Sequence, residues 1–250
     1  AIGDSPTYIK SQSEYSDYYT DFGWFGTLES IDNLSMYKIN MLNSNAIALR
    51  GEYVNIDSTI FNLSSGWNWI GYSPDISIDI STALNNIPDT YATYIKSQSE
   101  YADYYSDFGW FGTLETMNPL SGYLINLTDS TNFTYTDNTN IYRSIYLSNT
   151  LDKYNEYGLN IHNYEHNGSI TANISNENFE DYILLAYNDN DCIGVAESKI
   201  FPVSGNSVYP LMIYGNTSNN IYLKALHKPS NTYLDIKETF TFTPDMRLGS

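Results

Sequence analysis

The chain of 250 residues is short of positive charge and of cysteine. It holds 11 Lys and Arg against 29 Asp and Glu, which gives a formal net charge of −18. Because so few cations cannot neutralise the phosphates of a nucleic acid, we do not expect nucleic acid as a partner. The negative net charge also disfavours binding to anionic membrane surfaces. No apolar run approaches the roughly 18 residues of a spanning helix, so membrane insertion is not expected either.

The single cysteine, Cys192, excludes an intrachain disulfide and a thiolate metal cluster. We interpret it as a small buried apolar residue. Aromatic residues, in contrast, are abundant: they make up 16% of the chain, and 25 residues are Tyr. With 42% hydrophobic residues the chain can bury a core, and its length fits one large domain or two.

A repeat organises the first half of the sequence. Residues 8–29 and 94–115 are identical at 20 of 22 positions, at an offset of 86, and the similarity decays after them. The complete unit begins near Phe61 and includes the strand-like segment GWNWIGY (66–72). The first copy holds only the latter half of this unit, so we expect the chain to be a piece of a longer tandem array.

Local patterns predict the elements of the repeat. Ser81 is a candidate N-cap for two helical turns over 80–87. The segment YIKSQSEYADYY is ambiguous, because Ser97 and Glu100 fit a capping box while its many tyrosines and the following SDFG turn fit a β-hairpin. We favour the hairpin, and we predict a further strand over 123–127.

The second half has a different pattern, with short strands separated by turn signals every 8–12 residues. The predicted strands cover 159–164, 169–175, 181–188, 192–201, 207–215, 220–227, 232–237 and 239–243. The fold class is therefore expected to be mainly β, with small β-rich repeat modules, including a short helix, followed by an antiparallel β-sandwich. The predicted segments are a partial first repeat and connection (1–60), a complete second repeat (61–127), a linker (128–140) and the sandwich (141–250).

Two groups of motifs resemble a known family. The repeat unit GWNWIGY…IKSQSEYADYY…GWFGTLETMNPLSGY resembles tandem modules of large secreted or surface proteins, especially of Bacteroidetes. The runs AYNDNDCIGVAE, YPLMIYGN, YLKAL and FTPDMRLGS resemble the β-sandwich module that follows such repeats. The resemblance implies this architecture and an extracellular or cell-surface location. The chain departs from the pattern at Ile193, where such modules often carry a basic residue.

Candidate metal and catalytic motifs are weak. His162, Glu165 and His166 match the H-x-x-E-H pattern of inverted zincins, but the flanking Gly and Asn residues argue against the helix that zinc binding needs. Asp189 and Asp191 could offer oxygen ligands to calcium, although an EF-hand reading fails because Ile200 stands at its twelfth position. Nothing else predicts a cofactor, and we expect no enzymatic activity.

Repeated aromatic residues are the main binding candidates. We expect the four tryptophans, Trp24, Trp67, Trp69 and Trp110, to lie mainly in the core. The tyrosines expected to form a recurrent binding strip are Tyr18, Tyr19, Tyr104 and Tyr105.

The sequence thus predicts a non-enzymatic extracellular or surface protein region acting in adhesion or surface assembly. Two alternatives stay open: a carbohydrate-binding accessory region of a secreted enzyme, and a virion or filament subunit. The expected partner is a glycan or a protein surface, with self-association possible.

Overall fold

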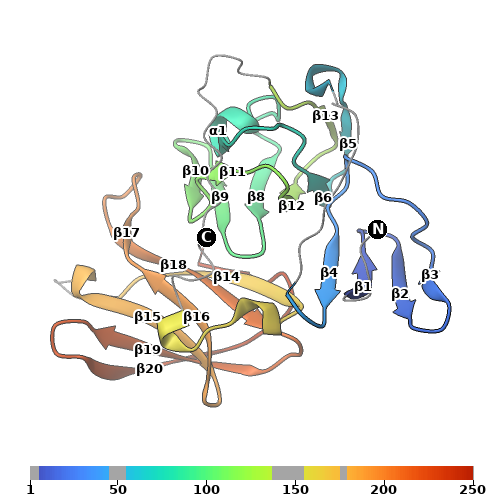
Figure 1. Ribbon diagram of the computed structural model, residues 1–250. Coiled ribbons are helices and arrows are strands. Elements are labelled where there is room, and N and C mark those ends of the chain that lie inside the picture. The colour runs from blue at the N-terminus through green and yellow to red at the C-terminus, as the bar shows by residue number, and fades with distance from the viewer. Residues whose placement is uncertain (1–5, 45–54, 137–154, 175–178, 250) are drawn as a thin grey trace. The chain divides into compact units, whose positions relative to one another are not determined.

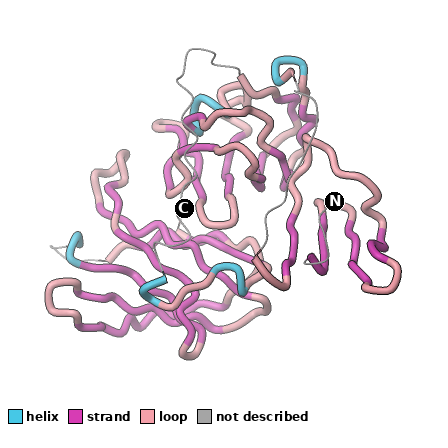
Figure 2. The backbone as a smooth tube through the Cα atoms, in the orientation of Figure 1, coloured by secondary structure: helices cyan, strands magenta, loops and turns pink. Residues whose placement is uncertain are grey.

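The protein is mainly β, as the sequence predicts. The computed structural model describes residues 6–44, 55–136, 155–174 and 179–249. Strands dominate these residues (Figure 2). The only α-helix among them is α1 (Ile80–Ala83). No helix in these ranges is long and apolar enough to cross a membrane.

The chain divides into two compact units that do not follow its order. Unit 1 comprises residues 1–97 and 115–146, and unit 2 comprises residues 98–114 and 147–250. The hairpin of the second repeat copy thus belongs with the C-terminal β-sandwich, whereas the hairpin of the first copy belongs to unit 1.

The first repeat copy forms a four-stranded sheet in unit 1 (Figure 1). Its strand order is β3-β2-β1-β4, with β1 (Pro6–Lys10), β2 (Tyr15–Tyr19), β3 (Gly23–Gly26) and β4 (Lys38–Met41). In this sheet β1 pairs with β4 through Ile9 and Ile39. The second copy pairs β8 (Ala92–Lys96) with β12 (Gly122–Leu127) in the equivalent register, Ile95 opposite Ile125.

The predicted GWNWIGY strand is β6 (Gly66–Gly71), which pairs with the other edge of β12. The first copy contacts β6 as well, because the Gln12 side chain donates to the carbonyl of Trp67 and accepts from the amide of Trp69. Smaller elements complete unit 1: the 3₁₀ helix η1 (Ile56–Ser58) and the strand pairs β5 (Phe61–Leu63) with β13 (Thr131–Phe133) and β7 (Ile78–Asp79) with β11 (Thr116–Met117).

Two local predictions in unit 1 need correction. The helix starts after Asp79, whose carboxylate accepts from the amides of Ser81 and Thr82, so Asp79 and not Ser81 is the N-cap, and the helix makes a single turn. Part of the predicted linker over 128–140 belongs to the folded unit, because it contains β13 and two buried rings. Phe133 and Tyr135 are buried against Phe61, because apolar rings next to a paired strand gain more by burial than by exposure to solvent.

Unit 2 contains the predicted β-sandwich (Figure 1). One sheet has the order β17-β18-β14-β21, with β14 (His166–Ala172), β17 (Lys199–Ile200), β18 (Ser207–Gly215) and β21 (Arg247–Leu248). The other has the order β16-β15-β19-β20, with β15 (Tyr182–Asn188), β16 (Asp191–Glu197), β19 (Asn220–His227) and β20 (Thr232–Thr241).

Alternating side chains of both sheets meet in one core. Ile170 of β14, Leu211 of β18, Leu184 of β15 and Leu223 of β19 belong to the same buried cluster. The strands predicted over 207–215 and 220–227 have the observed bounds, whereas 232–237 and 239–243 form the single strand β20. Three 3₁₀ helices lie between or before the strands: η2 (Asn155–Tyr157), η3 (Ile161–Asn163) and η4 (Phe179–Asp181).

The strand predicted over 159–164 is wrong, because η3 occupies this segment. The side chain of Asn160 accepts from the amide of His162 and starts the 3₁₀ turn.

Candidate functional site

The two repeat copies each contain a hairpin of nearly identical sequence. The first hairpin is formed by β2 and β3, residues 15–26, and the second hairpin by β9 (Tyr101–Tyr105) and β10 (Gly109–Gly112), residues 101–112. Their registers agree, since Tyr18 lies opposite Trp24 and Tyr104 opposite Trp110. The predicted hairpin reading of YIKSQSEYADYY is confirmed.

Glycines fix the shape of both hairpins. Gly23 and Gly109 have φ angles of 85° and 98°, in the left-handed region that favours glycine in a tight turn. A Cβ added at Gly26 or Gly112 would lie within 2.2 Å of the carbonyl oxygen of the facing Tyr15 or Tyr101. The close approach of the two strands therefore requires glycine in both copies.

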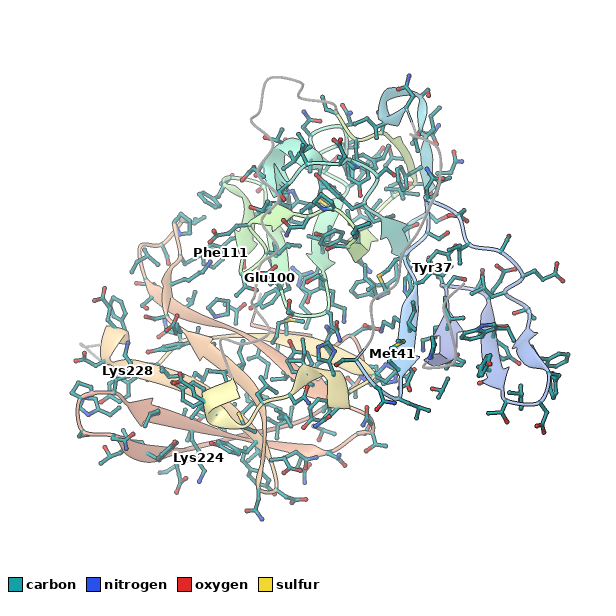
Figure 3. The ribbon with its side chains drawn as sticks, in the orientation of Figure 1. Tyr37, Met41, Glu100, Phe111, Lys224 and Lys228 are labelled. Carbon is teal, nitrogen blue, oxygen red and sulfur yellow. The ribbon has the colours of Figure 1, made fainter. Side chains whose placement is uncertain are left out.

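The second hairpin is docked on the sandwich through aromatic side chains. The ring of Phe201, which follows β17, lies 4.8 Å from the ring of Tyr105 and 5.0 Å from that of Phe111. Figure 3 labels Phe111 on β10. Edge-to-face pairs of this kind add about 0.5–1.5 kcal/mol each to the free energy of area burial.

Polar groups complete the docking. The Tyr101 hydroxyl donates to the carbonyl of Ile170 at 3.3 Å and shares a 2.9 Å hydrogen bond with the Thr171 hydroxyl. The ammonium of Lys199 donates to the carbonyl of Gly112 at 2.9 Å, and the side-chain amide of Asn167 donates to the carbonyl of Gln98 at 2.9 Å. Tyr101 is consequently 1% exposed.

An ion pair between a buried carboxylate and a more exposed arginine lies in the same interface. The carboxylate of Asp103 pairs with the Nε of Arg247 on β21, and Asp103 is 2% exposed. Burial raises the pKa of Asp103 from 3.8 to about 6, and the charge and hydrogen bond of Arg247 only partly counter this rise. We call the sandwich surface formed by Ile170, Thr171, Lys199, Phe201 and Arg247 the hairpin site.

The first hairpin exposes the counterparts of the docked rings. Tyr15 is 46% exposed, Tyr19 45% and Phe25 67%, and Phe22 is 66% exposed, as its counterpart Phe108 is to 49%. The rings of Tyr19 and Phe22 stack at 4.8 Å, and Phe22 contacts Phe25 edge-on at 6.3 Å, so these three rings form one continuous patch. We call Tyr19, Phe22 and Phe25 the aromatic patch. Asp17, which corresponds to Asp103, has no ion-pair partner among the described residues.

The structure separates the four tyrosines predicted to bind. Tyr18 and Tyr104 each pack edge-on against the tryptophan of their own hairpin, at 5.4 and 5.1 Å. Tyr105 packs against Phe201, and Tyr19 alone of the four is exposed. The ligand-binding role of these tyrosines stays a prediction.

The expectation that the tryptophans lie in the core is wrong. Trp24, Trp67, Trp69 and Trp110 are half-buried, and the fully buried large rings of unit 1 are instead Tyr94, Tyr123, Phe133 and Tyr135. The tryptophans lie on the repeat strands with one ring face covered, for example Trp67 by Tyr94 at 5.8 Å. Sequence reasoning also missed Phe201 and Arg247.

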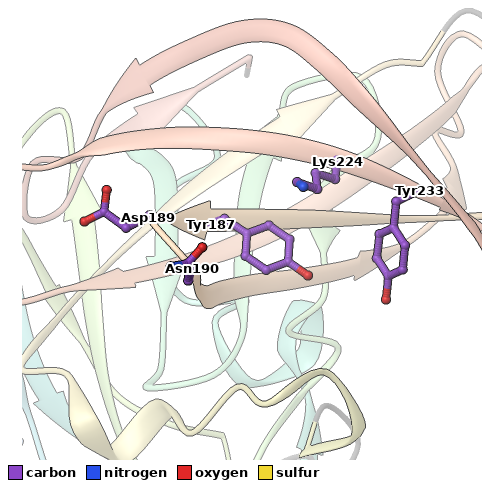
Figure 4. A pocket seen from close by; sticks show the side chains of 5 residues that line it. All are labelled: Tyr187, Asp189, Asn190, Lys224 and Tyr233. Carbon is purple, nitrogen blue, oxygen red and sulfur yellow. The ribbon is translucent and has the colours of Figure 1, made fainter.

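A further candidate site is an open depression on the sandwich (Figure 4). It is lined by Tyr187, Asp189, Asn190, Lys224 and Tyr233. The Lys224 ammonium lies 5.6 Å from the centre of the Tyr187 ring and 3.5 Å from the carboxylate of Asp235. Two ring faces, an amide, a carboxylate and an ammonium therefore share one open surface.

One of the two candidate calcium residues, Asp189, lines this depression. Asp189 occupies the β15–β16 turn with a φ angle of 51°, and Asp191 begins β16. No group of three His, Cys, Asp or Glu side chains that could hold a metal ion occurs among the described residues. Calcium binding by Asp189 and Asp191 stays a prediction.

The remaining motifs have simple local structures. His162 lies in η3 and His166 begins β14, so the two imidazoles do not share a helical turn. Cys192 is buried, its thiol points to the carbonyl of Gly194 at 3.6 Å, and burial raises the pKa of the thiol. A raised pKa lowers the thiolate fraction, which is the opposite of what a nucleophile requires.

Comparisons with known proteins provide no family. No family model matches the chain, and no match is found among curated proteins or solved structures. The functional argument therefore rests on the site itself.

Proposed function

We propose that this chain is a non-enzymatic region of an extracellular or surface protein, and that it acts in adhesion or surface assembly through the aromatic patch of its first hairpin. The observation that carries the proposal is the exposure of Tyr19, Phe22 and Phe25 as one patch. A patch of contiguous aromatic rings on a soluble unit is typical of interaction surfaces.

The chemistry of the patch suits a protein partner. Tyrosine offers a large contact area with few rotatable bonds, so little conformational entropy is lost when it is fixed. Phe22 and Phe25 add apolar area that is removed from water on binding, and the Asp17 carboxylate on the same hairpin can select a cationic group of the partner.

Repetition strengthens the proposal. Weak contacts made by the first hairpins of many chains on one surface add through effective concentration, so a surface coated with such chains can adhere even when a single contact is weak.

A bead-aggregation assay tests the proposal. Beads densely coated with the chain are expected to aggregate with each other or with glycan-coated beads, and beads coated with Y19A/F25A are expected to lose this aggregation. The matched control is Y105A/F111A, which carries the same changes in the docked hairpin and leaves the aromatic patch intact. Aggregation that is absent for the wild-type chain, or unchanged for Y19A/F25A, would contradict the proposal.

A carbohydrate-binding role is the second candidate, and the depression of Figure 4 favours it. Sugars are commonly recognised by an aromatic face together with a few polar groups, and Tyr187, Tyr233, Asn190 and Lys224 provide both. Affinity electrophoresis on plant and algal polysaccharides tests this role. Retardation that Y233A abolishes would support it, and an unretarded wild-type chain would remove it.

A further inference from the structure

The sandwich of this chain already shows what kind of surface holds a hairpin of this sequence. We propose that the first hairpin binds the hairpin site on the β-sandwich of a second copy of the chain. This inference rests on the proposed function and names its partner.

The side chains that bond or pack the second hairpin to the sandwich in the contacts given above have identical counterparts in the first. Tyr101, which bonds to Ile170 and Thr171, corresponds to Tyr15, and Asp103, which pairs with Arg247, corresponds to Asp17. The backbone and ring contacts correspond in the same way, through the pairs Gly112 and Gly26, Tyr105 and Tyr19, and Phe111 and Phe25.

The geometry of these groups corresponds as well. Asp17 lies opposite Phe25 on the paired strands, as Asp103 lies opposite Phe111, and both hairpins turn at a glycine with positive φ. The first hairpin therefore presents its carboxylate, hydroxyl and rings with the spacing that the hairpin site accepts.

Sequence identity between the copies is highest over residues 8–29, a segment that includes the residues of these contacts. The copies share 20 of 22 residues over 8–29, but only 5 of 12 over 30–41 and 1 of 7 over 1–7, each compared at the offset of 86. A common binding surface accounts for the likeness of the hairpin residues within this segment.

Charge narrows the choice of partner. With 11 Lys and Arg in 250 residues, a surface that holds Arg247 and Lys199 together is unusual for this chain. The positive charge of this surface complements the negative charge of the first hairpin, where the Asp17 carboxylate can pair with a cation. A partner without such a cation would leave the Asp17 carboxylate desolvated without compensation on docking.

Occupancy of the hairpin site controls this interaction. In each copy the second hairpin fills the site of its own chain, with an effective concentration in the millimolar range that a tether provides. Exchange between copies is therefore favoured where chains are densely displayed, or where the site has been vacated.

A charge exchange between two full-length variants tests the inference. In R247E the site repels the carboxylates of both hairpins, which vacates it, and in D17R the first hairpin carries the complementary cation. We expect sedimentation velocity to show that R247E and D17R form a one-to-one complex, at least about tenfold tighter than either variant forms with itself.

The matched control is D21R, which adds the same cation at the exposed turn of the same hairpin, outside the corresponding contacts. If R247E binds D21R as tightly as D17R, or binds neither while its unfolding stays cooperative, the inference is wrong.

A second variant applies even if R247E does not fold. A102S/S106T makes the second hairpin identical to the first, and we expect hydrogen exchange of its amides to remain within about threefold of the wild-type rates. Release of this hairpin, seen as exchange faster by about tenfold or more, would show that the first hairpin's sequence cannot occupy the site.

The outcomes separate the two claims. Wild-type beads that aggregate while the charge exchange fails would leave the adhesive function in place and remove the sandwich as its partner. Beads that aggregate with neither each other nor glycan would remove the function, even if R247E and D17R associate in solution.

Discussion

The two hairpins have nearly the same sequence but lie in different environments. Tyr101 is 1% exposed and its counterpart Tyr15 46%, although the local sequence, the strand register and the glycine turn agree. Asp103 is buried against Arg247, whereas Asp17 is half-exposed. The difference teaches that burial of these residues is decided by the surface that meets the hairpin, because the hairpin itself is the same.

The comparison also separates the effect of the covering surface from the effect of the hairpin itself. The rings of the second hairpin are covered by the sandwich of unit 2. The corresponding rings of the first hairpin are exposed, because nothing in the described chain covers them. Matched substitutions in the two copies therefore measure what docking contributes.

The largest expected effect on stability comes from removing Arg247, the cation that pairs with the buried Asp103 carboxylate. R247A leaves the Asp103 carboxylate buried without its partner, and we expect a loss of about 3–5 kcal/mol in the free energy of unfolding at pH 7.5. Urea unfolding followed by circular dichroism measures this loss. The control is D235A, whose carboxylate is 87% exposed beside Lys224, and for which the expected change is below about 1 kcal/mol. Equal losses for the two variants would contradict the account.

The pH dependence of stability is the next largest effect. Because burial raises the pKa of Asp103 from 3.8 to about 6, the folded chain holds this proton more tightly than the unfolded chain between these pH values. The contribution of Asp103 to stability therefore falls as pH rises from about 4 to 6, by roughly 1–3 kcal/mol.

Unfolding curves of wild type and D103N from pH 4 to 7.5 test this sign. Relative to D103N, the wild-type chain is expected to gain stability as the pH is lowered through about 6. D17N carries the same change in the first hairpin. A D17N profile that departs from wild type as far as that of D103N would show that docking is not the cause.

Truncating the matched phenylalanines gives a smaller difference. F111A removes a ring that packs against Phe201, and we expect it to cost about 1–2 kcal/mol, whereas F25A removes a ring that is 67% exposed and is expected to cost less than about 0.5 kcal/mol. Differential scanning calorimetry of both variants measures the pair. Similar losses would mean that the two hairpins are equally docked.

Removing one hydroxyl gives the smallest effect. Y101F loses the hydrogen bonds to Ile170 and Thr171, at an expected cost of about 1 kcal/mol, while Y15F is expected to stay within about 0.3 kcal/mol of wild type. The urea midpoint at constant slope resolves differences of this size. A larger loss for Y15F than for Y101F would reverse the comparison.

Much of the fold could be predicted from local pattern. Turn residues on both sides located β18, a nearly continuous apolar run, and β19, which largely alternates, to the residue, because both strands contribute side chains to the sandwich core. Capping was less predictable. Asp79 and Ser81 are both good N-cap residues, and only the tertiary structure, in which β7 ends at Asp79, decides between them.

The site could be predicted only in part. The repeat pointed to the hairpin aromatics, but sequence cannot tell Tyr15 from Tyr101, since the distinction lies in a surface built from Ile170, Phe201 and Arg247, far away in the chain. The tryptophans were predicted to lie in the core because their side chains are large and apolar. In the structure an edge position on a small sheet covers only one of their faces.

Hydrogen exchange with mass spectrometry tests the difference between the hairpins most directly, on the unmodified chain. Peptides from the two copies differ in mass because Ser16 and Thr20 correspond to Ala102 and Ser106, so both hairpins are followed in one experiment. The account predicts that amides of residues 101–112 exchange at least about tenfold more slowly than those of residues 15–26 in dilute solution. Equal exchange rates in the two hairpins would contradict it.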